Sequence, residues 1–373
     1  MVKKKAIILG GGFAGVTAAN FLKKKGIDVT IYEKSGILGG GCRTFFYNGH
    51  PYTFGPHHLL VDVKQPHVYD YMAQYLDLRK MDHYNMSYVA QDEAFYTFPI
   101  HKDEVELMPD KDAIYKELDA LPDSGIAANF DEFWRYSIGD TLYNKFMNSY
   151  SKKMWGIKNN TQLDEFTFSF KNKREDALKT GSKKSFDGTK NVYYPTAYDG
   201  YNSYFEECVK GCTVHFNTLI EGFDINAKKI YVDGEWHSAD IIVNTLSLDL
   251  IYDYHFGELP YMGRDFLKII LPVERITPEP YFFMHYAGDE PYTRIFEYKT
   301  LTQYKSPHTM IGIEFPSDKN KLYPYPILSE IEKAKKYMDL MPDDVYTIGR
   351  MGKYYYDNMD MIIADCFKLF SDI

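Results

Sequence analysis

The stretch Ala6–Leu9 followed by Gly10-Gly11-Gly12-Phe13-Ala14-Gly15 decides the fold of this chain. Four apolar residues predict a first β-strand, and the glycines after it have the spacing GxGxxG. Gly10 would allow a tight turn, Gly12 would leave room for a pyrophosphate at a helix N-terminus, and Gly15 would let helix and strand pack closely. The pattern therefore predicts a dinucleotide-binding turn.

A second strand is predicted over Asp28–Tyr32, after a helix over about residues 14–25. It ends at Glu33, where an acidic side chain accepts hydrogen bonds from the adenosine ribose. Strand, glycines, helix, strand and glutamate in this order predict a Rossmann-like unit. The alternative is a glycine-rich turn followed by a solvated glutamate.

A second glycine turn, Gly39-Gly40-Gly41-Cys42-Arg43, follows Glu33. With its arginine it resembles the two-dinucleotide-binding-domain flavoproteins, the amine oxidase-like group, whereas nicotinamide enzymes do not carry this turn. FAD is therefore expected rather than NAD, with Arg43 near its pyrophosphate or flavin. The residues expected to bind the cofactor are Gly10, Gly12, Phe13, Ala14, Gly15, Glu33, Lys34, Gly39, Gly40, Arg43, Val214, Arg350 and Met359.

Length, charge and cysteine content exclude several classes of protein. A chain of 373 residues is long enough for two domains, or for one large domain with insertions. The formal charge is −9 with no long basic stretch, so nucleic acid is not an expected partner. No apolar run reaches the roughly 18 residues of a membrane-spanning helix. Four cysteines favour a reduced cytoplasm, and no metal site is expected.

The remaining sequence predicts a Rossmann-like domain with large insertions. We expect a hairpin over residues 86–101, helices over 110–160, an irregular polar stretch over 161–201 and an apolar helix over about 361–370. Strand-like runs return at Val214–Asn217, Ile241–Thr245, Tyr281–His285, Met310–Phe315 and Val345–Ile348.

The predicted fold is α/β, with three parts. A Rossmann-like FAD-binding domain would take residues 1–70, 202–255 and 340–373. A helical insertion would take residues 102–160, and an antiparallel β-sheet substrate domain would take residues 71–101, 161–201 and 256–339.

Several further strings resemble the UDP-galactopyranose mutase family, flavoenzymes that convert pyranose nucleotide sugars into furanose forms. The resemblance runs along nearly the whole chain. Besides the glycine turn and Glu33, it is carried by Tyr150–Gly156 (YSKKMWG), Asp253–Gly257 (DYHFG), Pro291–Glu297 (PYTRIFE), Tyr325-Pro326 and Gly349–Tyr356 (GRMGKYYY).

The resemblance implies a nucleotide-diphosphate sugar as substrate and cations that bind its phosphates. Arg294 matches one of the family's two diphosphate-clamping arginines, and a guanidinium suits that task because it forms a bidentate fork. Arg174 is the nearest candidate for the second, with Lys183 and Lys184 as alternatives. For Arg294 itself, the alternative is a surface ion pair with Glu297.

The resemblance also implies roles for aromatic residues. Tyr325 and Tyr356 match two tyrosines that contact the diphosphate as a lid closes. Tyr150 matches the tyrosine that stacks on the base, and Trp155 matches the indole that lines the sugar pocket. Arg350 matches an arginine beside the flavin that favours its anionic reduced form. For Tyr150 and Trp155 the alternative is a helix buried in the core.

Several positions depart from the family pattern, and they cluster near the sugar. His57 keeps the first of two histidines near the flavin, but Leu60 replaces the second. His101 replaces a substrate-contacting asparagine, Asn358 replaces an aspartate, and His255 replaces an arginine. We therefore expect an altered substrate. The open choices are other hexoses, N-acetylated or 6-deoxy sugars and heptoses, on uridine, thymidine or guanosine diphosphates.

The implied reaction is a ring contraction without net redox change, in which only reduced FAD acts as the nucleophile. The resemblance therefore implies an external reductant such as NAD(P)H or a reductase. It also implies a role in surface polysaccharide biosynthesis (capsule or lipopolysaccharide) and is compatible with a homodimer. Two alternatives stay open. One is an FAD oxidase or dehydrogenase of the amine oxidase-like group, and the other is an inactive flavoprotein that binds nucleotide sugar.

Overall fold

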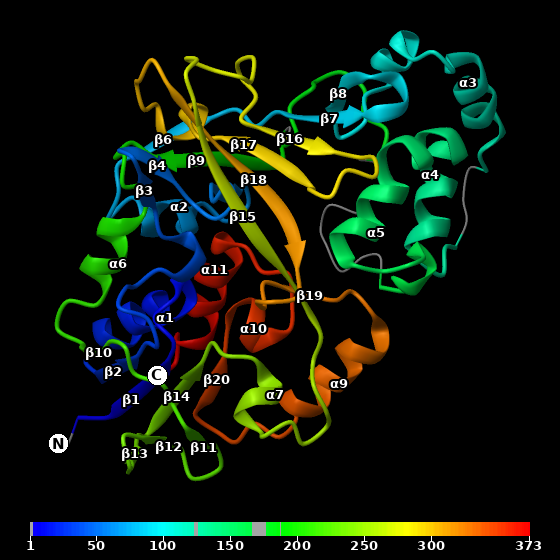
Figure 1. Ribbon diagram of the computed structural model, residues 1–373. Coiled ribbons are helices and arrows are strands. Elements are labelled where there is room, and N and C mark those ends of the chain that lie inside the picture. Colours follow the sequence, from blue (N-terminus) through cyan, green and yellow to red (C-terminus); the bar gives the residue numbers. More distant parts are fainter. Residues whose placement is uncertain (1–2, 123–125, 166–176, 187) are drawn as a thin grey trace.

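The computed structural model describes residues 3–122, 126–165, 177–186 and 188–373. A parallel sheet with its helices, a large mixed sheet and a helical lobe are joined in one molecule (Figure 1). The expected α/β fold is confirmed. Within the described residues, no helix is long and apolar enough to cross a membrane.

The parallel sheet forms the Rossmann-like part, and all its neighbouring strands are parallel. Its central strands are nearly continuous apolar runs because other parts of the fold cover both faces. In spatial order it contains β10 (Thr213–His215), β2 (Asp28–Tyr32), β1 (Lys5–Leu9), β14 (Ile241–Asn244) and β20 (Val345–Thr347). All five strands were predicted to within two residues at each end.

Three helices cover one face of this sheet. The first, α1 (Phe13–Lys24), connects β1 to β2 and packs against α11 (Met359–Leu369) and α6 (Asn202–Cys208). The other face packs against an antiparallel meander that the sequence analysis did not predict. Its strands are β11 (Gly222–Asp224), β12 (Lys229–Val232) and β13 (Glu235–Ser238).

The large sheet has seven strands, and only the pair β16 and β7 is parallel. In spatial order it contains β19 (Tyr323–Pro324), β15 (Tyr261–Leu271), β18 (Thr309–Ser317), β17 (Arg294–Glu297), β16 (Phe283–Tyr286), β7 (Asn85–Val89) and β8 (Ala94–Phe98). The predicted hairpin is confirmed as β7 and β8, around the 3-10 turn η2 (Ala90–Asp92). The longest strand, β15, was not predicted because glycine and charged residues interrupt its apolar pattern.

Two small antiparallel sheets join the parts. β9 (Lys190–Pro195) lies between β5 (Leu59–Asp62) and β6 (Leu78–Met81), and β3 (Phe45–Tyr47) pairs with β4 (His50–Tyr52). The prediction that 161–201 is irregular is therefore wrong for residues 190–195. That strand is short and bounded by turn residues, so its pairing with residues more than 100 positions away was not visible locally.

The helical lobe confirms the expected helices over 110–160. It contains η3 (Lys102–Leu107), α3 (Lys111–Ala120), α4 (Phe130–Tyr143), the π-helical turn η4 (Asn144–Asn148), α5 (Ser149–Trp155) and η5 (Asn160–Gln162). The apolar pairs four residues apart, Phe130 with Trp134 and Leu142 with Phe146, are all buried in its core. Figure 1 shows this lobe standing beside the large sheet.

Short helices complete the fold. α7 (Leu248–Ile251), α9 (Leu328–Met338) and α10 (Gly349–Lys353) gather near the start of β15, and α2 (Pro66–Met72) packs between β5 and α11. The helix expected over about 361–370 is confirmed as α11.

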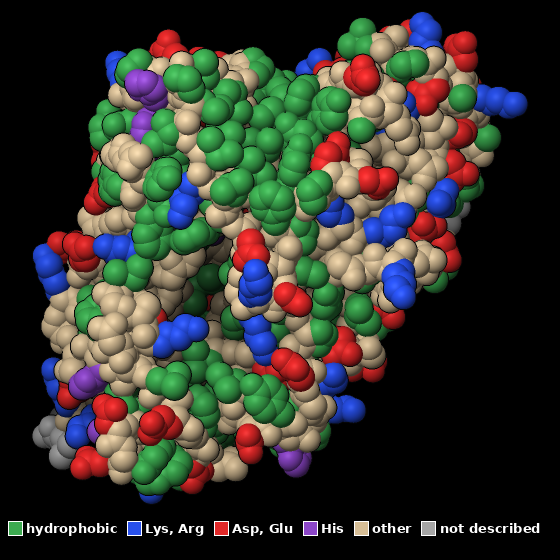
Figure 2. All heavy atoms as spheres, in the orientation of Figure 1, with side chains coloured by type: hydrophobic (Ala, Val, Ile, Leu, Met, Phe, Trp, Pro, Cys, Tyr) green, Lys and Arg blue, Asp and Glu red, His purple; other side chains and the backbone are tan. Residues whose placement is uncertain are grey.

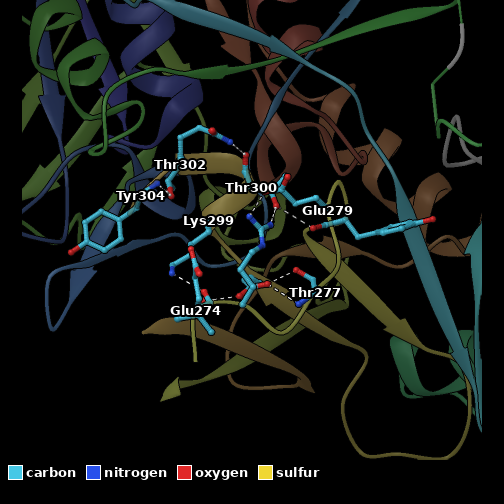
Figure 3. A network of polar contacts seen from close by, with 12 residues as sticks. Glu274, Thr277, Glu279, Lys299, Thr300, Thr302 and Tyr304 are labelled. Atoms are coloured by element: carbon cyan, nitrogen blue, oxygen red, sulfur yellow. Dashed lines mark hydrogen bonds and ion pairs between the residues drawn. The ribbon is translucent and has the colours of Figure 1, made fainter. Parts of the chain in front are cut away.

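A polar network ties the loop after β15 to the segment after β17, including α8 (Lys299–Thr302) (Figure 3). Lys299 Nζ donates to the carbonyl of Glu274 at 2.7 Å, and Arg275 donates to Glu279 at 2.6 Å. Glu297, at the end of β17, accepts from the backbone N–H of Thr277 at 2.8 Å. These bonds fix the far end of β17, whose first residue is Arg294.

Candidate active site

Two glycine turns meet at the N-terminus of α1. Gly39 forms a bridge with Gly12 and donates its N–H to the carbonyl of Gly11 at 2.8 Å. A Cβ on Gly15 would lie 1.9 Å from the carbonyl oxygen of Gly10, so only glycine allows this packing. A Cβ on Gly12 would meet nothing within 4 Å. The helix therefore begins in open space, without a side-chain cap, as an anion-binding N-terminus requires.

Glu33 closes one side of this glycine cradle. One carboxylate oxygen accepts from the N–H of Gly11 at 2.7 Å, and the other accepts from the N–H and hydroxyl of Ser35 at 2.8 and 2.7 Å. The carboxylate is thus oriented at the end of β2, where a ribose would reach it. Val214 pairs with Ile31 in the neighbouring strand, and Lys34 is exposed beside the glutamate.

Arg43, the arginine predicted near the pyrophosphate, contacts two protein groups and stays a proposed cofactor contact. Arg43 donates to the carbonyl of Leu38 at 3.3 Å and lies 3.8 Å from Glu206. Gly40 keeps a positive φ of 52°, and its Cβ would contact the Cα of Gly12 at 3.4 Å. Gly40 therefore belongs to the cradle by its backbone, whereas the Arg43 side chain is held at its rim.

The C-terminal unit returns the chain to the cradle, as predicted. Gly349 has a φ of 77°, and a Cβ there would lie 3.0 Å from that of Ala14. Phe13 turns inward onto Tyr204, so its ring belongs to the core. Met359, the first residue of α11, is also buried. The two glycine turns, Glu33 and this returning segment fit an extended dinucleotide such as FAD.

Arg294 and Glu314 form a buried bidentate pair across β17 and β18, where they are direct neighbours. Arg294 Nε and Nη2 donate to the two carboxylate oxygens at 2.9 and 2.7 Å. Burial opposes ionisation of Glu314, but Arg294 and Arg264 outweigh it and lower its pKa. The alternative pairing with Glu297 is wrong, because Glu297 is fully buried and accepts from Thr277 instead.

Two more arginines join Arg294 around one tyrosine ring. Arg264 on β15 lies 3.2 Å from Glu314, with its guanidinium 4.7 Å from the ring centre of Tyr323. The guanidinium of Arg350 on α10 lies 4.8 Å from the same centre, and Arg294 Nη2 lies 3.5 Å from the Tyr323 hydroxyl. With one carboxylate for three guanidinium groups, this arginine cluster carries a net charge of about +2.

The tyrosine that completes the cluster is not the predicted one. Tyr323 stacks on Tyr356 with ring centres 5.3 Å apart and an interplanar angle of 22°. Tyr325 instead lies against Trp155, with centres 5.8 Å apart. The string Tyr-Pro-Tyr-Pro at 323–326 offers two tyrosines, and only their placement beside β15 separates them. Tyr323 and Arg264 are the residues that the sequence analysis missed.

The aromatic residues of α5 line the same region. Tyr150 and Trp155 are half-buried, which argues against the alternative of a helix buried in the core. Desolvation raises the pKa of Tyr150 to about 12, although the nearby Arg294 lowers it. The Tyr150 ring packs edge-on against His285, with centres 5.3 Å apart. On the face of the molecule drawn in Figure 2, a hollow lies in the middle, below the large sheet.

His57 lies close to the arginine cluster, whereas the other substituted positions have different surroundings. Desolvation and the charge of Arg350 lower the pKa of His57 to about 4, so it is neutral at pH 7. His101 is buried, caps η3 through the N–H of Asp103 and contacts the Gly181 carbonyl at 3.1 Å. Its imidazole nitrogens therefore engage the protein itself.

Asn358 is half-buried, whereas His255 is exposed. Asn358 precedes α11, and its amide nitrogen is buried without a hydrogen-bond partner among the residues that the structure describes. Leu60, which replaces the family histidine, is buried on β5. His255 is exposed, in ring contact with Phe256.

The candidates for the second diphosphate-clamping cation have different surroundings. Arg174 lies outside the described residues. Lys183 donates to Glu104 at 2.7 Å, and Lys184 lies 2.9 Å from Asp82. Arg264, by contrast, contacts Glu314, the same carboxylate that Arg294 contacts, so the described structure places Arg264 beside Arg294.

A separate open hollow of about 450 Å³ near α9 includes none of these arginines. Its two lysines already have acidic partners, with Lys321 3.3 Å from Asp249 and Lys333 2.6 Å from Glu330. It therefore presents no excess of positive charge to an anion.

Comparison with known proteins agrees with this geometry. The family described as UDP-galactopyranose mutase matches residues 145–356, and an NAD(P)-binding Rossmann-like domain matches residues 8–75. A probable UDP-galactopyranose mutase of Klebsiella pneumoniae is 25% identical, over 99% of this chain and 94% of its own length. A dTDP-fucopyranose mutase of Escherichia coli is 23% identical, over 98% of this chain and 97% of its own.

Other similarities are shorter or concern the fold alone. A 1-hydroxycarotenoid 3,4-desaturase of Flavobacterium sp. is 39% identical, but over only 19% of this chain. A crystal structure of reduced UDP-galactopyranose mutase superposes with a TM-score of 0.80 at 18% identity, covering all of this chain and 94% of that one. Because the family match spans more than half of the sequence, this chain belongs to the UDP-galactopyranose mutase family.

Proposed function

We propose that this protein is a flavin-dependent isomerase, a mutase that interconverts the pyranose and furanose forms of a nucleotide-diphosphate sugar. The observation that carries the proposal is the position of Arg350. It belongs to the arginine cluster around Tyr323, and its charge also acts on Cys42 in the second glycine turn. An anion held by the cluster would therefore lie next to a flavin held by the cradle.

The charge of the cluster suits a diphosphate diester. Such a group carries two negative charges, and the cluster has an excess of about two positive charges. Guanidinium groups bind phosphate oxygens in bidentate fashion, which a lysine ammonium does not do. Glu314 contributes by orienting the guanidinium groups of Arg294 and Arg264, which it contacts at 2.7 and 3.2 Å.

The chain's own residues would bind and orient, and a bound reduced FAD supplies the nucleophile for the anomeric carbon. Arg294 and Arg264 would hold the diphosphate both in the substrate and after it has left the sugar. Arg350 would place a positive charge beside the flavin, favouring its anionic reduced form. Neutral His57 would offer a hydrogen bond without adding charge. The family chemistry needs no nucleophilic side chain, since the cofactor carries the covalent step.

Aromatic side chains would position the two ends of the substrate. Tyr356 would contact the diphosphate, with Tyr325 closing over the site from beside Trp155. Tyr150 would stack on the base, and Trp155 would line the sugar pocket. His101 and Asn358 stay proposed substrate contacts, and Arg174 stays a proposed second clamp. Phe13, Lys34, Val214, Met359 and the glycines stay proposed FAD contacts.

Finer parts of the proposal depend on the relatives. Because one relative is a dTDP-fucopyranose mutase, the candidate substrates include 6-deoxy sugars, and the candidate nucleotides include thymidine diphosphate as well as uridine diphosphate. We propose that the enzyme is cytoplasmic and that NAD(P)H or a reductase reduces its flavin. Its product would be used in the synthesis of capsule or lipopolysaccharide. The three-part domain division and a homodimer belong to the same proposal.

The test is conversion of nucleotide sugars by the reduced holoenzyme. Dithionite-reduced protein is incubated with UDP-, dTDP- and GDP-sugars, and the products are separated by chromatography. Conversion of at least one pyranose into its furanose, with none by the oxidised enzyme, is expected. An ordinary oxidase would instead bleach its flavin with substrate and consume oxygen, and that result would replace this function with the oxidase alternative.

A further inference from the structure

Tyr323 is enclosed by charges that come from several elements. The groups that face it are Arg264 on β15, Arg294 on β17, Glu314 on β18 and Arg350 on α10, together with the phenols of Tyr356 and of Tyr150 on α5. Three of the four charged groups are cations, and the single carboxylate is already shared between Arg264 and Arg294. The cluster therefore has an excess of about two positive charges around the side chain of Tyr323.

We propose that Tyr323 is the resident counter-ion of the arginine cluster, and that its phenolate takes up a proton from solvent to become a phenol when a nucleotide diphosphate binds. Above about pH 8 the ligand-free enzyme holds a phenolate at Tyr323, and its oxygen partly balances the arginines. A bound diphosphate supplies at least two negative charges at the same place, so the phenolate is protonated and Tyr323 becomes neutral. The inference rests on the proposed function, since it requires that the cluster binds a diphosphate.

The contrast between Tyr323 and its neighbours supports this assignment. Desolvation raises the pKa of Tyr323, but Arg294, Arg350 and Arg264 outweigh this effect and lower it to about 8. Tyr150 lies near Arg294 and Arg264 as well, yet desolvation keeps its pKa at about 12. Among the tyrosines that the structure describes, only Tyr323 has all three guanidinium groups of the cluster around its side chain. The difference therefore follows from geometry.

Ionisation of Tyr323 should make binding of a diphosphate weaker as the pH rises. Below pH 8 the phenol is already neutral, and affinity for a diphosphate does not depend on Tyr323 ionisation. Above pH 8 the phenolate must gain a proton before the ligand is fully bound, so the apparent Kd rises by up to about tenfold per pH unit. The rise ends at the higher pKa that Tyr323 has in the complex, because two anionic charges have arrived.

The first experiment needs no ligand. The absorbance of the oxidised holoenzyme near 295 nm is titrated from pH 6.5 to 9.5, for the wild type and for Tyr323→Phe. The difference between the two curves should show one tyrosine ionising with a midpoint near 8. Tyr325→Phe, two residues away, is the matched control and should leave this midpoint in place. A difference curve with a midpoint at 10 or above would overturn the proposal.

The second experiment measures proton uptake on binding. UDP, with dTDP in parallel, is titrated into the oxidised holoenzyme at pH 8.5 in two buffers of different ionisation enthalpy. About three quarters of a proton should be taken up per site by the wild type, and none by Tyr323→Phe. The Kd of Tyr323→Phe should also stay constant from pH 7 to 9. Flavin content and melting temperature verify that each variant is folded.

The outcomes separate this inference from the proposed function. Tight binding of UDP or dTDP without proton uptake would overturn the role of Tyr323 and leave the mutase function standing. Failure of both nucleotides, and of GDP, to bind the folded wild-type holoenzyme would overturn both. Equal proton uptake by wild type and Tyr323→Phe would assign the proton to another group and also refute the inference.

Discussion

Replacing Arg294 with alanine should reduce both ligand binding and stability, by separate mechanisms. Its guanidinium makes two hydrogen bonds to Glu314, whose side chain is only 3% exposed. Removing one member of a buried ion pair costs about 3 to 5 kcal/mol. Glu314 keeps Arg264 at 3.2 Å and the Thr293 hydroxyl at 2.9 Å, so we expect the lower end, about 3 kcal/mol.

The loss of binding comes from the phosphate side of the same group. A charge-assisted fork contributes roughly 1.5 to 3 kcal/mol, so affinity for UDP or dTDP, or kcat/KM, should fall at least about tenfold. Arg294→Lys should recover only part of this, because it keeps the charge and loses the bidentate geometry. Adding Glu314→Gln to Arg294→Ala should restore neither the binding nor the stability, because the buried Arg264 then loses its carboxylate partner as well.

Denaturant unfolding of the holoenzyme and calorimetric titration measure the two effects. Lys319→Ala is the control, because it removes an exposed pair with Asp265 on the same sheet and should cost less than about 1 kcal/mol. Flavin content should not change in either variant. If Arg294→Ala unfolded within 1 kcal/mol of the wild type and bound nucleotide normally, both the ion-pair reasoning and the assignment of Arg294 to the site would be refuted.

Three further predictions follow from the cradle and from α10. Gly12→Val should fold, because Gly12 has a φ of −69° and open space at its Cβ, but should purify without flavin; full yellow occupancy would refute the cradle. Gly15→Val should instead fail to fold, and normal yield and melting temperature would contradict the 1.9 Å contact. Burial raises the pKa of Asp357 from 3.8 to about 6, so as pH rises through this range the unfolded state loses its proton first and stability falls. Asp357→Asn should therefore gain up to about 3 kcal/mol at pH 7 and nothing at pH 3, and equal gains at both would refute it.

Local sequence was sufficient for the dinucleotide-binding unit. The strand, the glycine turn, the helix and Glu33 lie within about 30 consecutive residues, and each follows from backbone geometry that its own residues impose. The strings around Arg294, Trp155 and Arg350 identified the family in the same way, because each is contiguous. The apolar pairs of α4 were predictable since helical periodicity is also a local property.

The arginine cluster depended on tertiary structure. Glu314 became the partner of Arg294 through the register of β17 and β18, 20 residues apart in the chain. Arg264 joined them from β15, a strand that no local pattern predicted. The choice of Tyr323 over Tyr325 followed from strand pairing, because Tyr323 lies in β19 opposite Met262 of β15, whereas Tyr325 lies beyond the end of that strand. Such choices depend on how distant strands align, and a shift by one residue would turn each side chain to the opposite face, so only the assembled sheet determines them.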